Sequence, residues 1–182
     1  MKKTIIILGK PGSGKDTQIQ LLCDKYGYGV INTGDIVRSL KTKDAKVNMD
    51  LAQGKLADNK LVNELVGDKI DNIQARNKFI TNGYPRSLEQ AIWFDEFLAE
   101  AGRMVDLVVY IDIKDETSLK RLSNRKRSDD NTDTVKNRLN VFKQETEEVL
   151  DYYQKAAKLV RVDGEGSIEN IHIRIEELLV ED

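Results

Sequence analysis

The chain has 182 residues, enough to bury a substantial core within one domain. Its 29 basic and 31 acidic residues give a formal net charge of −2, so no excess positive field attracts the whole molecule to nucleic acid or to a membrane. One cysteine excludes an internal disulfide, and one cysteine with one histidine excludes a zinc cage of such ligands. We therefore expect a cytoplasmic protein with no nucleic-acid partner, no membrane partner and no structural zinc.

The first predicted element is a strand over residues 5–8, where four apolar residues precede Gly9. The run is too short for a membrane span, and Lys10 interrupts it before it could form the apolar region of a signal peptide. An all-apolar strand is typical of a parallel sheet that helices cover on both faces. Similar runs lie at 78–81, 107–111 and 159–162, with a weaker one at 29–32.

Helical patterns separate these strands. We predict helices over residues 14–26, 58–74, 87–101, 115–125, 133–153 and 167–180. The predicted N-caps are Asp58, Ser87, Asp115 and Ser167, and Gln90 completes a capping box with Ser87. This alternation predicts an α/β fold with right-handed crossovers, interrupted by two polar segments, one between residues 33 and 61 and one around residues 125–131.

A glycine-rich stretch, residues 9–15, follows the first strand and opens the first helix. Its spacing, Gly9-x-x-x-x-Gly14-Lys15, is the P-loop pattern in its required context. The glycines let backbone N–H groups turn toward a polyphosphate, while the helix N-terminus and Lys15 add positive potential. The stretch therefore predicts a nucleotide phosphate site.

Two polar residues near this loop are unusual. Asp16 follows Lys15, where P-loops usually carry a hydroxyl that contacts the metal. Asn82 ends the run at 79–82, where most P-loop enzymes place a carboxylate near the metal. An acid close to bound phosphate is repulsive unless a cation such as Mg²⁺ lies between them.

Ordered motifs along nearly the whole chain resemble those of the adenylate kinase family of nucleoside monophosphate kinases. They are residues 9–18, 32–38, 54–57, 82–86 with Gln90, Arg121-Leu122-x-x-Arg125, Arg127-x-Asp129-Asp130, Arg138-Leu139, and 162–166. The resemblance implies a P-loop NTPase fold with a five-stranded parallel sheet and helices on both faces. It also implies the magnesium-dependent reaction of ATP and AMP to give two ADP, catalysed by a monomer.

The resemblance divides the chain into a core (1–32, 62–124 and 132–182), an inserted NMP-binding segment (33–61) and a very short LID (125–131). The LID has almost nothing between Arg125 and Arg127, so we expect a minimal flap and less complete shielding of the site. The resemblance also implies a cis peptide bond between Tyr84 and Pro85.

On the donor side, the resemblance implies that the phosphate loop surrounds ATP and that Arg121 and the backbone near Gly166 hold its adenine. The implied ATP-binding residues are Gly12, Ser13, Gly14, Lys15, Asp16, Thr17, Arg121, Arg125 and Gly166. No protein atom is expected to bind the metal directly, and Asp16 is a candidate to hold its water shell.

On the acceptor side, the resemblance assigns AMP to the inserted segment and the turn after residue 82. The implied AMP-binding residues are Thr33, Arg38, Lys55, Leu56, Ala57, Gly83, Tyr84, Pro85, Arg86, Gln90, Arg127 and Arg138. The implied catalytic residues are Lys15, Arg38, Arg86, Arg125, Arg127 and Arg138.

Placing guanidinium groups at these positions suits phosphoryl transfer between two anions, since their planar forks match phosphate oxygens. No general base is needed, because the acceptor is already an anionic phosphate oxygen. The placement of the arginines therefore favours a functional role; for the run Arg125 to Arg127, the alternative is a solvated charged link balanced by Asp129 and Asp130.

The family usually has Gly at the position of Asp16 and Asp at that of Asn82. We hypothesise that the carboxylate has moved across the site, so that Asp16 orders the waters of the magnesium ion. The alternative is that Asp16 faces solvent and the metal needs no acid.

Two other functions stay open. A UMP/CMP kinase shares the scaffold, although such enzymes tend to have Ala at the position of Thr33 and Asn at that of Gln90. A nucleotide-binding homologue that has lost catalysis would explain Asn82 and the short LID, but Lys15 and the arginines are all present.

Overall fold

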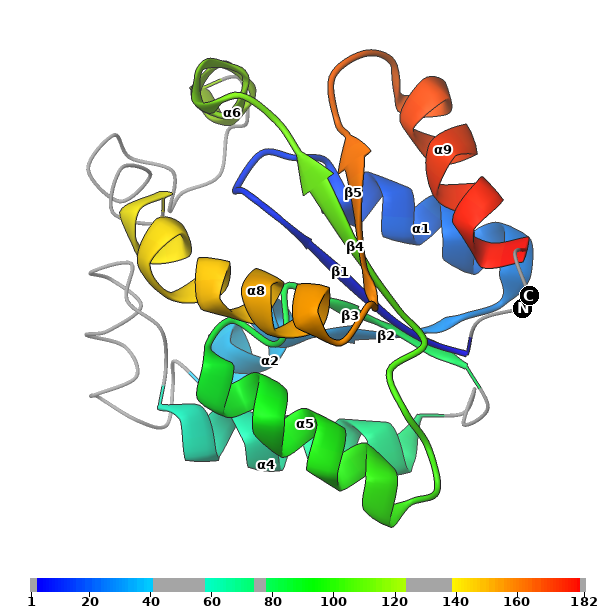
Figure 1. Cartoon of the computed structure of the whole chain (residues 1–182), viewed down its shortest axis with the longest axis vertical. Helices are drawn as coiled ribbons and strands as arrows, with labels where there is room; N and C mark the ends of the chain where they lie inside the picture. The colour runs from blue at the N-terminus through cyan, green and yellow to red at the C-terminus, as the bar shows by residue number, and fades with distance from the viewer. Residues whose placement is uncertain (1–2, 41–57, 74–77, 124–138, 181–182) are drawn as a thin grey trace.

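The computed structural model describes residues 3–40, 58–73, 78–123 and 139–180. Within these residues, five parallel strands form one sheet in the order β2-β3-β1-β4-β5 (Figure 1). The strands are β1 (Thr4–Gly9), β2 (Gly29–Asn32), β3 (Phe79–Asn82), β4 (Leu107–Asp112) and β5 (Leu159–Asp163). The predicted α/β class with a five-stranded parallel sheet is confirmed.

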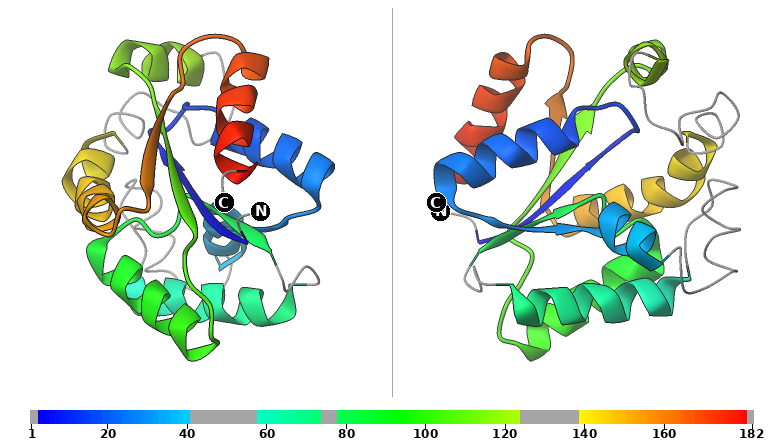
Figure 2. Two further views of the ribbon diagram at one scale, coloured as in Figure 1. Left: turned by 45° about the vertical axis from the view of Figure 1, so that its right-hand side comes forward. Right: turned by 180° about the vertical axis from the view of Figure 1, so that it is seen from behind.

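Strand β1 lies at the centre of the sheet and is buried along its whole length. Successive side chains of a strand point to opposite faces, so Ile5 and Ile7 pack into one core and Ile6 and Leu8 into another. Helices α1 (Lys15–Tyr26) and α9 (Ile168–Val180) contribute to the first core. Helices α4 (Asn59–Asn72), α5 (Leu88–Glu100) and α8 (Glu147–Lys155) contribute to the second (Figures 1 and 2).

The strand register brings the functional loops to one edge of the sheet. Ile7 pairs with Asn82 of β3, and Gly9 pairs with Ile111 of β4. Because parallel strands point the same way, the loops that follow β1, β3 and β4 emerge side by side. Ligands of open α/β sheets bind at this carboxyl edge.

Three of the four predicted N-caps are confirmed. The Asp58 carboxylate accepts from the backbone N–H of Leu61 at 3.1 Å, and the Ser87 hydroxyl accepts from that of Gln90 at 3.3 Å. Ser167 accepts in the same way at the start of α9. Each cap satisfies one of the amide donors that a helix start leaves unpaired.

Two details of the predicted caps are wrong. Asp115 is the first residue of α6 (Asp115–Ser123) rather than its cap, since its carboxylate is engaged by two lysines instead. The capping box at Ser87 is only half formed, because the side-chain oxygen Oε1 of Gln90 accepts from the backbone N–H of Arg86 instead of that of Ser87.

The helix predicted over residues 133–153 is interrupted. Residues 139–141 are helical, a π-helical turn, η1 (Phe142–Thr146), follows, and α8 continues the segment. Within this turn Lys143 reaches the carboxylate of Asp115, and the Thr146 hydroxyl donates to the backbone carbonyl of Arg86 at 3.3 Å. π-turns of this kind occur often at functional sites.

The inserted segment is described only in part. Helix α2 (Thr33–Leu40) begins it directly after β2, while residues 41–57 and the whole of the predicted LID, 125–131, lie outside the described residues. The peptide bond between Tyr84 and Pro85 is cis, as predicted. Among the described helices, none combines the length and the apolar character needed to cross a membrane.

Candidate active site

The phosphate loop runs from the end of β1 to the start of α1 and rests on α6. Gly12 has a positive φ of 81°, and a Cβ there would lie 3.0 Å from the backbone oxygen of Ser118 and 3.2 Å from Leu122. Ser118, which is buried, donates its hydroxyl proton to the carbonyl of Pro11. Glycine is therefore required at position 12 both for its backbone conformation and for the close approach of α6.

Lys15 is the first residue of α1, and its ammonium group folds against the loop. Its Nζ donates to the carbonyl of Gly9 at 2.6 Å and to that of Lys10 at 3.1 Å. Burial, together with the nearby charge of Arg86, lowers the pKa of Lys15 to about 8, while Asp16 opposes this shift. A bound polyphosphate would raise the pKa of Lys15 again, because its negative charge would stabilise the ammonium form.

Asp16 and Asn82, 66 residues apart in the chain, are in direct contact. The Asn82 side chain donates from Nδ2 to Oδ1 of Asp16 at 2.8 Å. Asn82 is buried at the end of β3, whereas Asp16 is exposed in the first turn of α1. The carboxylate is thus exposed, as in the alternative interpretation, yet it is held by a buried amide from the facing strand.

The turn that follows β3 is fixed from both ends. The exposed Arg86 donates from Nε to the carbonyl of Gly83 at 2.7 Å. Gln90 is buried, and its amide accepts from the backbone N–H of Arg86 and donates to Asn59 Oδ1, both at 2.8 Å. In this structure Gln90 therefore positions the turn that carries Arg86.

Two other residues that were predicted to bind AMP are buried beside this turn. The Thr33 hydroxyl donates to the carbonyl of Asn82 at 3.2 Å. Tyr84 points into the core, where its hydroxyl donates to Asn63 at 2.7 Å and its ring packs edge-on against Phe94. Any contact of Tyr84 with a ligand at the sheet edge would therefore involve its backbone.

Arg121 links the phosphate loop to the loop between β5 and α9. Its guanidinium donates to the carbonyl of Gly164 at 3.1 Å and to that of Gly12 at 3.5 Å. Arg86 and Arg121 thus both adjoin the phosphate loop, at Lys15 and at Gly12 respectively. The position of the Arg38 side chain on α2 is not described. The remaining predicted residues, Lys55, Leu56, Ala57, Arg125, Arg127 and Arg138, lie outside the described residues.

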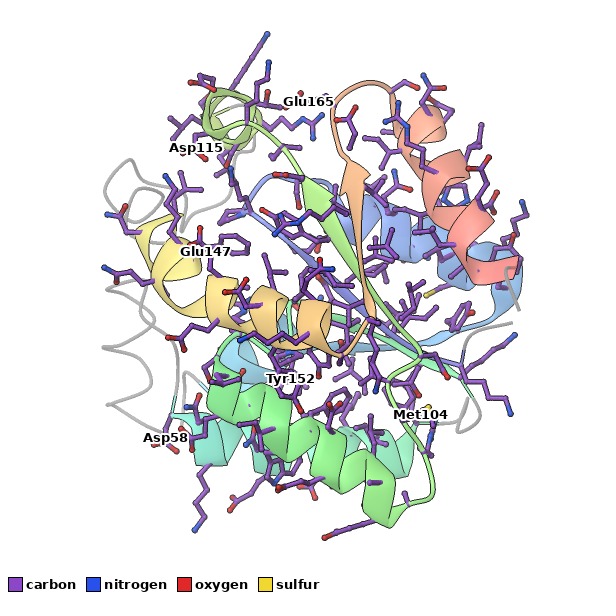
Figure 3. The ribbon with its side chains drawn as sticks, viewed as in Figure 1. Asp58, Met104, Asp115, Glu147, Tyr152 and Glu165 are labelled. Atoms are coloured by element: carbon purple, nitrogen blue, oxygen red, sulfur yellow. The ribbon has the colours of Figure 1, made fainter. Side chains whose placement is uncertain are left out.

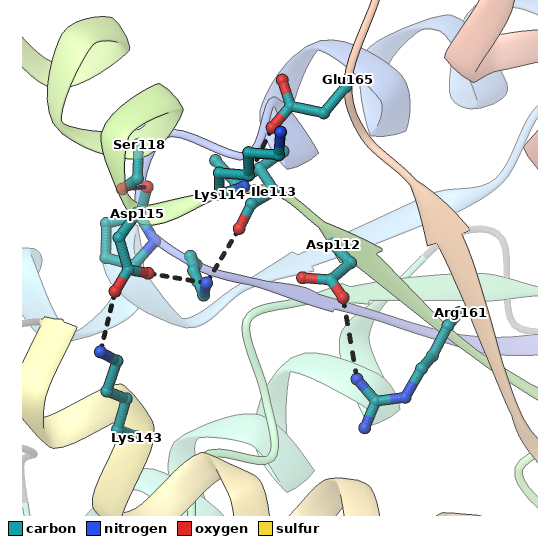
Figure 4. Close-up of polar contacts among 10 residues, drawn as sticks. Asp112, Ile113, Lys114, Asp115, Ser118, Lys143, Arg161 and Glu165 are labelled. Carbon is teal, nitrogen blue, oxygen red and sulfur yellow. Dashed lines mark hydrogen bonds and ion pairs between the residues drawn. The ribbon is translucent and has the colours of Figure 1, made fainter.

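Sequence reasoning missed a cluster of charged residues around Asp115. Lys10 of the phosphate loop donates from Nζ to the Asp115 carboxylate at 2.7 Å and to the carbonyl of Ile113 at 2.8 Å. Lys143 of η1 donates to the same carboxylate at 2.8 Å (Figure 4). Hydrogen bonds from the two lysines, first Lys10 and then Lys143, hold the pKa of Asp115 below its ordinary value. Lys10 could have been suspected from its place inside the P-loop, but no local pattern marks Lys143.

Among the described residues, no group of three or more His, Cys, Asp and Glu side chains could hold a metal ion. The donor set at the loop is one carboxylate, Asp16, with its neighbouring amide. Such a set fits Mg²⁺ that is bound mainly by substrate phosphates and keeps several of its waters. Asp16 could then contact that water shell.

Residues 7–158 match the family described as Adenylate kinase. The chain belongs to the adenylate kinase family. As a member, it is a nucleoside monophosphate kinase, a phosphotransferase with the phosphate loop, Lys15 and Arg86 at one sheet edge.

Relatives of this kinase match it over nearly the full length of both chains. It is 38% identical to the adenylate kinase of Mycobacterium sp. (strain MCS) over 174 residues, which cover 93% of this chain and 95% of the relative. It is 34% identical to that of Rhizobium meliloti (strain 1021), with 96% and 98% covered, and 33% identical to that of Synechococcus sp. (strain WH7803), with 97% and 98% covered.

Proposed function

We propose that this adenylate kinase family member catalyses the reversible, magnesium-dependent transfer of the γ-phosphoryl group of ATP to AMP, giving two ADP. The observation that carries the proposal is the meeting of Lys15, Arg86 and the Asp16–Asn82 pair at the carboxyl ends of β1 and β3. Two cationic side chains beside a loop whose backbone N–H groups turn inward suit the phosphate groups of two nucleotides that meet end to end. Relatives that bear the name adenylate kinase support the choice of ATP and AMP.

On the donor side, the loop from Gly12 to Thr17 would surround the phosphates of ATP. With a pKa of about 8, Lys15 is mostly protonated at neutral pH and supplies a cation to these phosphates. Arg121 and the backbone near Gly166 would hold the adenine base. The hydrogen bonds from Arg121 to the phosphate loop at Gly12 and to the β5–α9 loop at Gly164 support this assignment. Arg125 would complete this side.

On the acceptor side, Arg86 and Arg38 would bind the phosphate of AMP. Thr33, Gln90 and the backbone of residues 55–57 would bind its base and ribose, with Gly83, Tyr84 and Pro85 forming the intervening turn. Arg127 and Arg138 would approach the phosphoryl group in transfer. The fixed turn at Arg86 supports this assignment, because a guanidinium on a rigid turn needs little reordering to bind phosphate.

The reaction needs positioning and charge stabilisation rather than a general base. An oxygen of the AMP phosphate attacks the γ-phosphorus of ATP in line, and the bond to the β,γ-bridging oxygen breaks, leaving ADP on each side. Lys15 and the arginines stabilise the negative charge on the phosphate oxygens throughout. Water must be excluded, since it would otherwise accept the phosphoryl group.

Mg²⁺, when bound with ATP, neutralises part of the charge on the β- and γ-phosphates. We propose that Asp16 holds the water shell of this ion, in place of an acid at position 82. The Asn82 amide supports this role because its hydrogen bond fixes the carboxylate. The carboxylate remains exposed at the mouth of the loop.

We also propose that the chain acts as a cytoplasmic monomer with a core (1–32, 62–124 and 132–182), an NMP-binding segment (33–61) and a LID (125–131). Exposed large apolar residues in the described part of the chain are spread over several elements, which argues against one large docking face. They are Ile92, Met104, Leu119, Ile168 and Ile173. Light scattering after size exclusion would measure the mass in solution.

The function is tested by mixing the purified protein with ATP, Mg²⁺ and one nucleoside monophosphate at a time, and measuring diphosphates by chromatography. We expect ADP to form with AMP far faster than any diphosphate forms with UMP or CMP. Faster turnover with UMP or CMP would assign the protein to those acceptors. Nucleotide binding without turnover would assign it to a non-catalytic role.

A further inference from the structure

The loop between β5 and α9, residues 164–167, is held tightly against the sheet at Gly164. The backbone N–H of Gly164 donates to the carbonyl of Asp112 at 2.8 Å. A Cβ at position 164 would lie 2.6 Å from Cγ2 of Ile111 and 2.8 Å from Cγ2 of Ile113. These contacts fix the base of the loop but leave the residues after Gly164 to be positioned by other groups.

Glu165, in the middle of this loop, uses both of its carboxylate oxygens on another segment. Oε1 accepts from the backbone N–H of Lys114 at 2.9 Å (Figure 4). Oε2 accepts from the hydroxyl of Thr117 at 3.1 Å. The donors lie 51 and 48 residues away, at the start of α6. These hydrogen bonds, together with the charge of Arg121, hold the pKa of Glu165 below its ordinary value.

The backbone of Glu165 is fixed as well. Its N–H donates to the side chain of Asp163 at 3.0 Å, and its carbonyl accepts from Arg174 at 3.4 Å. Both the backbone and the carboxylate of Glu165 are thus hydrogen-bonded, and the carboxylate joins the loop to the first turn of α6.

The same helix carries Arg121, which contacts the loop at Gly164 and the phosphate loop at Gly12. Its first residue, Asp115, is joined to Lys10 of the phosphate loop. Helix α6 is thus tied at its N-terminal end to both loops, through Glu165 on one side and Lys10 on the other. Figure 3 shows Asp115 and Glu165 at this same end of the molecule.

We propose that Glu165 is a positioning residue for the donor nucleotide. By holding the first turn of α6, it keeps the guanidinium of Arg121 and the backbone of Gly166 at the spacing that a flat purine base requires. This inference rests on the proposed function, in which these two groups bind the adenine of ATP. Glu165 contacts α6 rather than ATP, so it affects donor binding only through Arg121 and Gly166.

The test compares Glu165→Ala, Glu165→Gln and Thr117→Val in the full chain, with Glu116→Ala as the matched control. Glu116 is an exposed acid in the same first turn of α6. Because two hydrogen bonds are lost, we expect Glu165→Ala to raise the Kd and the KM for ATP by about fivefold to tenfold. The KM for AMP and kcat should stay within about twofold, since the acceptor site and the transferring groups are untouched.

The milder variants should rank between these limits. Glu165→Gln keeps an acceptor for the N–H of Lys114 and should lose no more than about twofold in ATP affinity. Thr117→Val removes one of the two donors and should fall between Glu165→Gln and Glu165→Ala. The control Glu116→Ala should match the original protein.

Direct calorimetric measurement of ATP binding separates this inference from the proposed function. If ATP binds and weakens in Glu165→Ala as expected, the inference holds even in the absence of ADP formation, which would contradict only the proposed reaction. Unchanged ATP affinity in Glu165→Ala would overturn the inference while leaving the reaction intact. Equal losses for ATP and AMP, or an equal loss in Glu116→Ala, would show a general structural effect and would also overturn it.

Discussion

At the level of single residues, the ammonium group of Lys15 is surrounded by oxygen atoms of the phosphate loop and lies near a second cation, Arg86. Burial and the charge of Arg86 bring its pKa from 10.5 to about 8. The unprotonated amine binds phosphate poorly, so the fraction of protonated Lys15 controls donor affinity. Because the folded-state pKa is depressed, that fraction falls as the pH rises through about 8, whereas an unperturbed lysine would stay charged there.

We therefore predict that ATP affinity falls by about tenfold between about pH 7 and about pH 9, as expected for one group of pKa about 8. Isothermal titration calorimetry at several pH values would measure it. Lys15→Arg, whose guanidinium stays charged throughout, should show a much smaller change. Taking the ratio of the two proteins at each pH removes the titration of ATP itself, and a ratio that does not vary with pH would contradict the assignment to Lys15.

The second prediction at this scale concerns the hydrogen bond from Asn82 to Asp16. Asp16→Gly should raise the Mg²⁺ concentration needed for half-maximal activity, because the water shell of the ion loses its acceptor. Asn82→Asp should also be impaired, since it would place two carboxylates in contact. The double variant restores a single acid and should recover, with a coupling energy of about 0.5–3 kcal/mol.

This cycle is measured as Mg²⁺ dependence of activity and, independently, as Mg²⁺ dependence of ATP affinity. Additive losses, with the double variant worse than either single one, would show that the two positions do not share one function. Asp16 would then be an exposed acid without a role at the metal.

At the level of elements, α4 illustrates how a local signal fixes a helix start. Asp58 caps the helix through the N–H of Leu61. Asp58→Ala should lower the free energy of unfolding by about 1 kcal/mol, because a helix amide loses its acceptor. Asp58→Asn keeps an acceptor and should change stability far less. Urea unfolding followed by circular dichroism would measure both, and equal losses would show that charge rather than capping is responsible.

Helix α6 and the π-turn η1 show the limit of local signals. Asp115 looked like an N-cap because it precedes a helical pattern, but Lys10 and Lys143 engage its carboxylate and the helix begins at Asp115 itself. The periodic pattern around residue 142 favoured one continuous helix. It did not indicate η1, whose Lys143 and Thr146 reach residues distant in sequence.

At the level of the whole molecule, β1 joins two cores that lie on opposite faces of one sheet. Trp93, the only tryptophan, packs beside the core that contains Ile6, while Ile7 belongs to the other. Since both cores share β1, we expect them to unfold together as one cooperative unit.

Ile7→Val tests this cooperativity. It should destabilise the protein by about 0.5–1.5 kcal/mol, as the loss of one buried methylene does elsewhere. The unfolding midpoint followed by Trp93 fluorescence should shift as much as the midpoint followed by far-ultraviolet circular dichroism, although the change lies on the opposite face. Ile6→Val is the control on the face of Trp93. If the unfolding midpoint followed by Trp93 fluorescence did not shift in Ile7→Val, the two faces would unfold separately.

Much of the fold could be predicted because its signals are contiguous. The all-apolar run of β1 indicated a buried parallel strand, Asp58 and Ser87 marked helix starts, and the spacing from Gly9 to Lys15 indicated a phosphate loop. The family followed from motifs in a fixed order, and the match over residues 7–158 confirmed it.

The sequence by itself thus determined the α/β class, the phosphate loop and the family. Short-range periodicity, capping and glycine spacing depend only on residues that are close together in the chain. Only the tertiary structure decided that Asn82 holds Asp16, that Glu165 binds the start of α6, and that Lys10 meets Asp115. The physical reason is the strand order β2-β3-β1-β4-β5, which differs from the chain order. This order brings loops that are far apart in sequence to one edge of the sheet. Side chains from these loops therefore interact because they lie close in space, which no short stretch of sequence indicates.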